Sequence, residues 1–224
     1  MSKPHVIILA PGWGETAVTM RPLRQLLESN GHTVVSVEHS RRRSGSQQEV
    51  MAARADDILA VVAAYDQTVT VIAHSLGAVD AVAAAQRLPE VFRHLILVNP
   101  AGIACPMAMA RLMARFSRKL LHDPAGQWRV GTGSAIKNLR LAYLEGLSAA
   151  GANLDSALHE LVDKDVKITV LASAEDVLFR YSDIDGRLAK HPRIQLIEIT
   201  GTHDAIHRQP ERYIDNLQQI LTLM

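Results

Sequence analysis

The fold of this chain is indicated by residues 69–77, which read Val-Thr-Val-Ile-Ala-His-Ser-Leu-Gly. The first four residues are β-branched and predict a buried strand. The Ala-rich run 78–87 that follows predicts a helix closed by Pro89. The five residues between these two elements therefore form a sharp turn from a strand into a helix, with Ser75 at its centre.

A serine at such a turn is suited to nucleophilic chemistry. Ala73 and Gly77, two positions on either side of Ser75, are small enough for the turn to close. The turn directs the Ser75 hydroxyl away from the sheet and aims the next backbone N–H, that of Leu76, at the same point. These five residues thus predict a nucleophile and one half of an oxyanion hole. His74 is expected to be a packed or hydrogen-bonded structural residue.

Strands and helices alternate along the rest of the chain. Helices are predicted at 16–29, 49–65, 78–87 and 205–221, and a short one lies between the last two strands. Near-continuous apolar strands separated by helices predict an α/β fold, with a mostly parallel six-stranded sheet covered by helices on both faces. The predicted strands are Val6–Ala10, Thr33–Glu38, Val69–Ala73, His94–Val98, Lys167–Ala172 and Ile194–Ile199.

The stretch 101–165 departs from this alternation, because it contains no convincing strand. Apolar residues recur in it at helical spacing on both sides of a Gly/Ser-rich break at Gly131–Ser134. We expect one domain over 1–224, with 101–165 inserted as a helical cap over the carboxyl ends of the strands. Its methionines 107, 109 and 113 could line a pocket for an acyl or alkyl group, and Met107 and Met113 are the candidate substrate-binding residues. The alternative that they form only the packing face of the cap stays open.

Two later strands end in the partners that a serine nucleophile needs, namely a base and an acid that orients it. The strand ending at Ala172 leads to Glu175-Asp176, and the strand ending at Ile199 leads to Gly201-Thr202-His203-Asp204. Because the carboxyl ends of parallel strands share one edge of the sheet, these loops should converge on Ser75. We predict Asp176 as the acid and His203 as the base.

Neighbouring residues offer alternatives to these assignments. Glu175 competes with Asp176, and His207, one helical turn after His203, competes as the base. Asn99 ends the fourth strand but cannot replace the acid, because an amide does not stabilise an imidazolium ion. Asp204 is expected to cap the final helix.

These residues resemble those of the α/β-hydrolase superfamily, in a compact form, over nearly the whole chain. The resemblance assigns Ser75 as nucleophile, Asp176 as acid, and His203, shortly before Pro210, as base. The family's oxyanion loop matches Pro11-Gly12-Trp13-Gly14, with Pro11 where many members carry His. It implies that the second oxyanion N–H belongs to Trp13, with Gly14 as the alternative, and the Trp13 side chain is a candidate for the substrate pocket. The family's Asp-x-x-Gly-x-Gly loop reads Glu38-His39-Ser40-Arg41-Arg42-Arg43 here.

Composition narrows the function further. A net charge of +1 and a hydrophobic fraction of 48% give little support to nucleic-acid binding. Cys105 is the single cysteine, which excludes an intrachain disulfide, and it is expected to be a small buried thiol. No apolar run is long enough to cross a membrane, so we expect a cytoplasmic protein. We expect no metal, and the Arg41–Arg43 run is expected to be a solvated loop.

The sequence therefore predicts a serine hydrolase that needs no cofactor and cleaves a small carboxylic ester or thioester through an acyl-enzyme. Carbon–carbon bond hydrolysis and acyl transfer on the same three residues remain open. So does a ligand-binding receptor that keeps the three residues but turns over negligibly. A purely structural protein is a further alternative, and the sequence does not indicate an oligomeric state.

Overall fold

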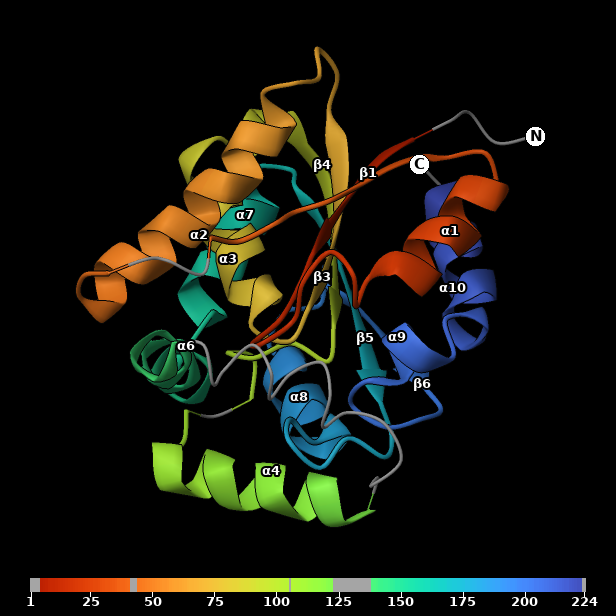
Figure 1. Ribbon diagram of the computed structural model, residues 1–224. Helices are drawn as coiled ribbons and strands as arrows, with labels where there is room; N and C mark the ends of the chain where they lie inside the picture. The colour runs from red at the N-terminus through yellow and green to blue at the C-terminus, as the bar shows by residue number, and fades with distance from the viewer. Residues whose placement is uncertain (1–4, 41–43, 105, 123–137, 223–224) are drawn as a thin grey trace.

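The computed structural model describes residues 5–40, 44–104, 106–122 and 138–222 (Figure 1). It contains a six-stranded sheet in the order β2-β1-β3-β4-β5-β6, and every neighbouring pair of strands is parallel. The predicted fold class is confirmed. The strands are β1 (Val6–Ala10), β2 (Thr33–Ser36), β3 (Val69–His74), β4 (Phe92–Val98), β5 (Lys167–Ser173) and β6 (Gln195–Ile199).

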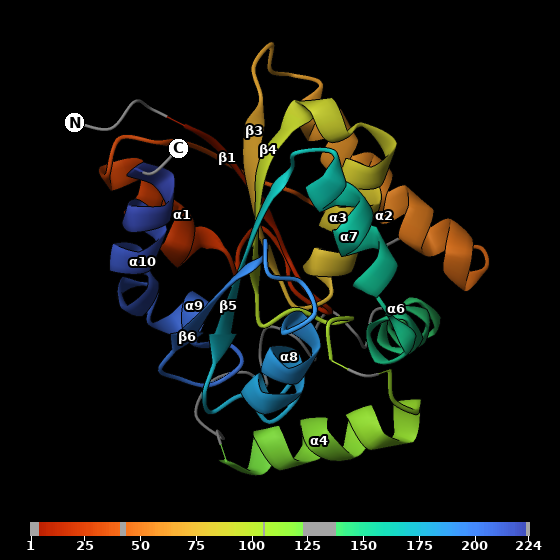
Figure 2. The same cartoon turned by 180° about the vertical axis from the view of Figure 1, so that it is seen from behind.

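Helices cover both faces of this sheet (Figures 1 and 2). Side chains of β1 alternate between two apolar clusters: Ile7 and Leu9 belong to one, and Val6 and Ile8 to the other. Burial on both faces explains why the central strands read as near-continuous apolar runs. The first cluster lies under α1 (Arg21–Ser29), α9 (Ala205–Arg208) and α10 (Glu211–Thr222). The second lies under α2 (Gln47–Val62), α3 (Gly77–Arg87), α7 (Asp155–Asp163) and α8 (Tyr181–Leu188), and the short helix η1 (Pro89–Val91) precedes β4.

Two helix starts differ from the predicted ones because of local polar contacts. The predicted helix from Thr16 begins at Arg21, since Thr19 forms a turn with Thr16 through its side chain and backbone. The helix predicted from Glu49 begins earlier, at Gln47. Ser46 accepts the Glu49 N–H, and the Glu49 carboxylate accepts the Ser46 N–H, which forms a capping box.

The last predicted helix, 205–221, is wrong as one element, because the structure divides it into α9 and α10. Pro210 has no N–H to donate and restricts the residue before it. Gln209 accordingly leaves the helical region, with φ −138° and ψ 56°. The short helix α9 therefore forms a separate unit directly after His203.

The predicted insertion, 101–165, contains α4 (Met109–His122), α6 (Leu139–Gly151) and α7. Helix α4 crosses beyond the carboxyl ends of the strands, α6 lies nearby, and α7 lies alongside α3 (Figures 1 and 2). Asn138 caps α6 by accepting the Leu141 N–H at 3.0 Å. The predicted break at 131–134, the Arg41–Arg43 run and Cys105 lie outside the described residues.

Within the described residues, no helix combines the length and the apolar character that crossing a bilayer requires.

Candidate active site

Ser75 occupies a strained turn at the end of β3. Its φ is +54°, a left-handed conformation that a non-glycine residue adopts only when the surroundings impose it. The Ser75 N–H donates to the Val98 carbonyl at 3.0 Å, and the Ser75 carbonyl accepts from the N–H groups of Ala78 and Ala101, at 3.1 Å each. A Cβ on Gly77 would lie 2.4 Å from the Ala10 carbonyl oxygen, so the turn closes only around a glycine there.

The loop after β1 lies directly against this turn. A Cβ on Gly12 would lie 3.0 Å from both the His74 carbonyl oxygen and the Ser75 Cβ, so the two backbones pack in close contact. The N–H groups of Trp13 and Leu76 donate to no backbone carbonyl in the described part of the chain. Both N–H groups thus remain available beside Ser75, as an oxyanion hole would require.

Asp176 and His203 are in direct contact. Asp176 Oδ2 lies 2.6 Å from His203 Nδ1, and the other oxygen, Oδ1, accepts the N–H groups of Leu178 and Phe179 at 2.7 and 3.2 Å. Both residues are buried, at 3% exposed. Since a carboxylate accepts, the ring donates from Nδ1, and Nε2 of a neutral His203 is left able to take a proton.

The backbone of His203 is fixed as well. Its carbonyl oxygen accepts from His74 Nε2 at 2.9 Å and from Asn99 Nδ2 at 2.8 Å. Asn99 also bonds Ser173 through both ends of its amide, and it has a φ of +45°. Asn99 is therefore a support of the loop that carries His203. His74 is fully buried and hydrogen-bonded, as predicted.

A cavity of about 40 Å³ brings Ser75 and His203 together. Part of its wall comes from the loop after β1, part from the loops after β5 and β6, and part from α4 and α6. Trp13 contributes to it, and the Trp13 ring packs 5.8 Å from that of Phe116 on α4. Met107 and Met113 are not among the lining residues. These are Trp13, Glu15, Ser75, Leu112, Phe116, Lys119, Ala149, Leu178, Phe179, His203 and Asp204.

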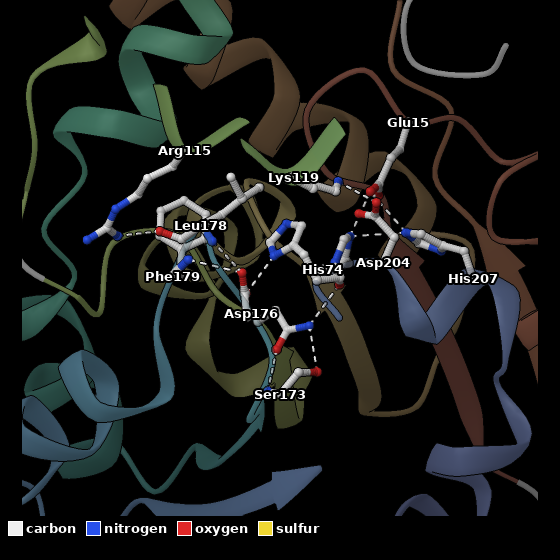
Figure 3. Close-up of polar contacts among 12 residues, drawn as sticks. Glu15, His74, Arg115, Lys119, Ser173, Asp176, Leu178, Phe179, Asp204 and His207 are labelled. Atoms are coloured by element: carbon white, nitrogen blue, oxygen red, sulfur yellow. Dashed lines mark hydrogen bonds and ion pairs between the residues drawn. The ribbon is translucent and has the colours of Figure 1, made fainter. Parts of the chain in front are cut away.

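The loop after β5 is also held from the α4 side. Arg115 Nη1 donates to the Leu178 carbonyl at 2.5 Å (Figure 3). Arg115 also lies 3.6 Å from the carboxylate of Asp183. Because the Leu178 N–H is bonded to Asp176, α4 is linked to the residue that contacts His203. Glu175, the alternative acid, is exposed and is not part of this contact.

Glu15 joins the site although the sequence offers no motif for it. Its Oε1 lies 2.7 Å from His74 Nδ1 and 2.9 Å from His207 Nε2, and its Oε2 accepts the Gly12 N–H at 2.6 Å (Figure 3). Burial raises the pKa of Glu15, but His207 and His74 outweigh this effect and hold that pKa well below its ordinary value. His207, the alternative base, is thus occupied with Glu15.

Asp204 differs from its predicted role. It stands at the N-cap position of α9, but its side chain makes no capping hydrogen bond and instead forms an ion pair with Lys119 of α4 (Figure 3). Burial raises the pKa of Asp204, but Lys119, together with His203 and His74, lowers it by more, so the net shift is downward. The ion pair ties α4 to the residue after His203.

A second buried ion cluster lies behind the loop after β1. Arg54 of α2 is 3% exposed, and its guanidinium contacts Asp80 of α3 at 2.8 Å and Glu145 of α6 at 2.7 Å. It also donates to the Pro11 carbonyl at 3.2 Å. Burial lowers the pKa of Arg54, but the two carboxylates raise it by more, so the net shift is upward.

Comparisons with known proteins agree with this architecture. Three solved structures of similar fold cover most of both chains at low sequence identity. A hydrolase from Oleispira antarctica is 14% identical, with a TM-score of 0.75 over 98% of this chain and 91% of that one. A deformylase from Pseudomonas putida S16 is 19% identical, with a TM-score of 0.73 over 96% of this chain and 92% of that one. The esterase RhEst1 from Rhodococcus sp. ECU1013 is 17% identical, with a TM-score of 0.71 over 97% of this chain and 90% of that one.

No curated protein matches the chain by sequence. The family model described as "Alpha/beta hydrolase family" matches residues 7–216, which is nearly the whole chain. This match includes the strand-to-helix turn at Ser75, the loop after β1 and the loops that carry Asp176 and His203. The chain therefore belongs to the α/β-hydrolase family.

Proposed function

We propose that this protein is a serine hydrolase that cleaves a small carboxylic ester or thioester through an acyl-enzyme. The observation that carries the proposal is the 2.6 Å contact between Asp176 and His203, with His203 and Ser75 lining one cavity. The chemistry of a hydroxyl, an imidazole and a carboxylate in this order is that of nucleophile, general base and orienting acid.

In the proposed reaction, His203 Nε2 takes the proton from the Ser75 hydroxyl while the oxygen attacks the substrate carbonyl. Asp176 holds the ring in the required tautomer and stabilises the imidazolium that forms, without taking the proton itself. The imidazolium then protonates the leaving alcohol or thiol as its bond to the acyl carbon breaks. Water attacks the acyl-enzyme with His203 again as base, and the carboxylic acid is released as Ser75 recovers its proton.

The negative charge that develops on the carbonyl oxygen needs donors placed in advance. The N–H groups of Leu76 and Trp13 are the proposed donors, supported by the close packing of the two loops and by the absence of backbone acceptors for them among the described residues. Removing one such donor in other serine hydrolases costs about 3 kcal/mol in the transition state. Gly14 is the alternative donor in the same loop.

We propose that α4 and α6 form the cap over this site. Leu112, Phe116 and Lys119 of α4 and Ala149 of α6 line the cavity, which supports this role. The cavity of about 40 Å³ is far smaller than the roughly 300 Å³ or more of typical ligand pockets. A short acyl group is therefore the substrate part that we expect beside Ser75.

The test is a substrate panel assayed with the wild type and with Ser75→Ala. The panel contains p-nitrophenyl acetate, a short acyl thioester and a β-diketone, each with water or with an added alcohol as the acceptor. Rapid hydrolysis of the ester or the thioester, abolished in Ser75→Ala, is the expected result. Cleavage of the diketone alone would make the protein a carbon–carbon bond hydrolase, and a dominant ester of the added alcohol would make it an acyltransferase. Equal rates for the wild type and Ser75→Ala would reject the proposal.

A further inference from the structure

We propose that Glu15 is a positioning residue that holds the oxyanion loop, defined as residues 11–15, in its catalytic geometry. Its carboxylate contacts three segments at once, namely this loop, the end of β3 and α9. The inference rests on the proposed function, because it concerns the donor that Trp13 offers to the substrate. Glu15 itself is assigned no contact with the reacting atoms.

The first contact is within the oxyanion loop. Glu15 Oε2 accepts the Gly12 N–H at 2.6 Å, and the Glu15 N–H donates to the Gly12 carbonyl at 3.3 Å. These two bonds close a turn that has Trp13 inside it. Since Gly12 also packs against the backbone at Ser75, the carboxylate fixes the orientation of the Trp13 peptide relative to the nucleophile.

The other carboxylate oxygen reaches the remaining two segments. Oε1 lies 2.7 Å from Nδ1 of His74, the residue before Ser75. It lies 2.9 Å from Nε2 of His207, which belongs to the helix that follows His203. One side chain therefore connects the oxyanion loop with the loops that carry the nucleophile and the base. Figure 3 shows His74 and His207 directed at Glu15.

Counting protons at His74 gives the charge state of this contact. The carbonyl oxygen of His203 can only accept, so His74 Nε2 carries a proton; the Glu15 carboxylate accepts at Nδ1, so that atom carries one as well. His74 is thus an imidazolium with no solvent exposure. Burial lowers the pKa of His74, but Glu15, helped by Asp204 and the His203 carbonyl, raises it by more, so the net shift is upward.

The surrounding charges balance this ion pair. Asp204 and Lys119 form the second pair of the site, and both also line the cavity. Two carboxylates therefore face two cations. Glu15 Oε1, His74 Nδ1 and His207 Nε2 lie within 3.1 Å of one another, a spacing at which they could also act as ligands of a divalent cation. The charges of Glu15 and His74 already balance one another without a metal ion, so the structure favours the ion pair.

The experiment compares Glu15→Ala, Glu15→Gln and Glu15→Asp with the wild type. The readouts are kcat and KM for p-nitrophenyl acetate, Ki for a methyl trifluoromethyl ketone, whose adduct with Ser75 carries an oxyanion, and the melting temperature. Glu38→Ala is the matched control, because Glu38 accepts the Ala17 N–H further along the same β1–α1 connection at 3.1 Å and lies outside the site.

Glu15→Ala is expected to lower kcat/KM about 100-fold through kcat, since displacing the Trp13 N–H donor by about 1 Å has such an effect. The Ki should rise by the same factor, while KM stays within about threefold. Glu15→Gln can still accept the Gly12 N–H and can donate to a neutral His74, so it should recover activity to within about tenfold of the wild type. Glu15→Asp keeps the charge but is one methylene too short, and it should lie between the two. Glu38→Ala should leave kcat, KM and Ki unchanged.

Several results would overturn the proposal. If Glu15→Ala folds and keeps the wild-type kcat and Ki, or if only its melting temperature falls, Glu15 has a structural role alone. If Glu15→Ala does not fold, Glu15→Asp and Glu15→Gln decide the question, and wild-type kcat and Ki in both would reject it. One Zn²⁺ per chain in the purified wild type, with activity lost to a chelator and restored by Zn²⁺, would make the cluster a metal site. If the wild type hydrolyses no ester and its Ser75 is unreactive, the proposed function fails first and this proposal fails with it.

Discussion

Asp176 Oδ2 lies 2.6 Å from His203 Nδ1, and the two residues come from loops after different strands of one parallel sheet. The remaining oxygen of Asp176 is occupied by two backbone N–H groups, so the carboxylate cannot turn without losing them. This contact places the Nδ1 proton of His203 on the side of Asp176, which leaves Nε2 of a neutral ring able to take a proton. The first prediction concerns this contact.

Asp176→Asn should lower kcat by about 10⁴-fold, because an amide can present its N–H₂ group to Nδ1 and leave the ring in the wrong tautomer. The measurement is kcat for p-nitrophenyl acetate across the pH range. Glu175→Gln removes the neighbouring carboxylate, which is exposed, and should leave kcat unchanged. Equal losses in both variants would mean that the charge of the loop matters and the contact with His203 does not.

Phe116→Ala should shift the substrate preference toward longer acyl chains, because Phe116 lines the cavity beside Ser75. The ratio of kcat/KM for p-nitrophenyl hexanoate to that for p-nitrophenyl acetate should rise about tenfold. Met113→Ala changes the same helix outside the cavity lining and should leave the ratio within about twofold of the wild type. A larger shift in Met113→Ala than in Phe116→Ala would assign the acyl pocket to the other face of α4.

Arg54→Met should lower the free energy of unfolding by about 3–5 kcal/mol, because it leaves the carboxylates of Asp80 and Glu145 buried without their cation. Denaturant unfolding measures this loss. Arg87→Met is the control, since Arg87 pairs with Asp56 at 2.7 Å on the surface, with both side chains at least half exposed, and should cost less than about 1 kcal/mol. Similar losses in the two variants would show that burial of the Arg54 cluster has no special weight.

His94 should make the protein less stable in acid. Burial lowers the pKa of His94 from 6.5 to about 4, with Lys167 and Arg93 adding to the effect. The unfolded chain therefore takes up a proton near pH 6.5, while the folded ring stays neutral until about pH 4. The free energy of unfolding falls as the pH drops through this window, by about 3 kcal/mol in all.

The measurement for His94 is denaturant unfolding at several pH values between 7 and 4, for the wild type and for His94→Gln. The glutamine can keep the hydrogen bond that His94 Nε2 makes with Thr169 Oγ1 at 2.9 Å, but it does not titrate. The variant should lose less stability than the wild type over this range. Parallel curves for the two proteins would show that His94 does not contribute to the pH dependence.

The fold and the contact between Asp176 and His203 could be predicted because they depend on local patterns. Most strands are near-continuous apolar runs, and each of these two residues lies in the loop that follows such a strand. In a parallel sheet the carboxyl ends share one edge, so convergence of the loops follows from the strand order.

Glu15 could not be predicted, since its partners His74 and His207 are distant in sequence and none of the three belongs to a pattern that implies the others. A carboxylate after a glycine-rich loop ordinarily faces solvent. The lining of the cavity illustrates a second limit. Periodicity predicts that α4 has an apolar face. Leu112 and Phe116 line the cavity, but Met113, the residue directly after Leu112, does not. The orientation of a helix depends on packing between distant elements.

Labelling with a fluorophosphonate probe, mapped by mass spectrometry of the modified peptides, tests most directly whether Ser75 is a nucleophile activated by His203. We expect one probe per chain on Ser75, no labelling in Ser75→Ala, and labelling at least about 100-fold slower in His203→Ala. Labelling that persists in Ser75→Ala, or a wild-type rate in His203→Ala, would show that Ser75 and His203 do not have these roles.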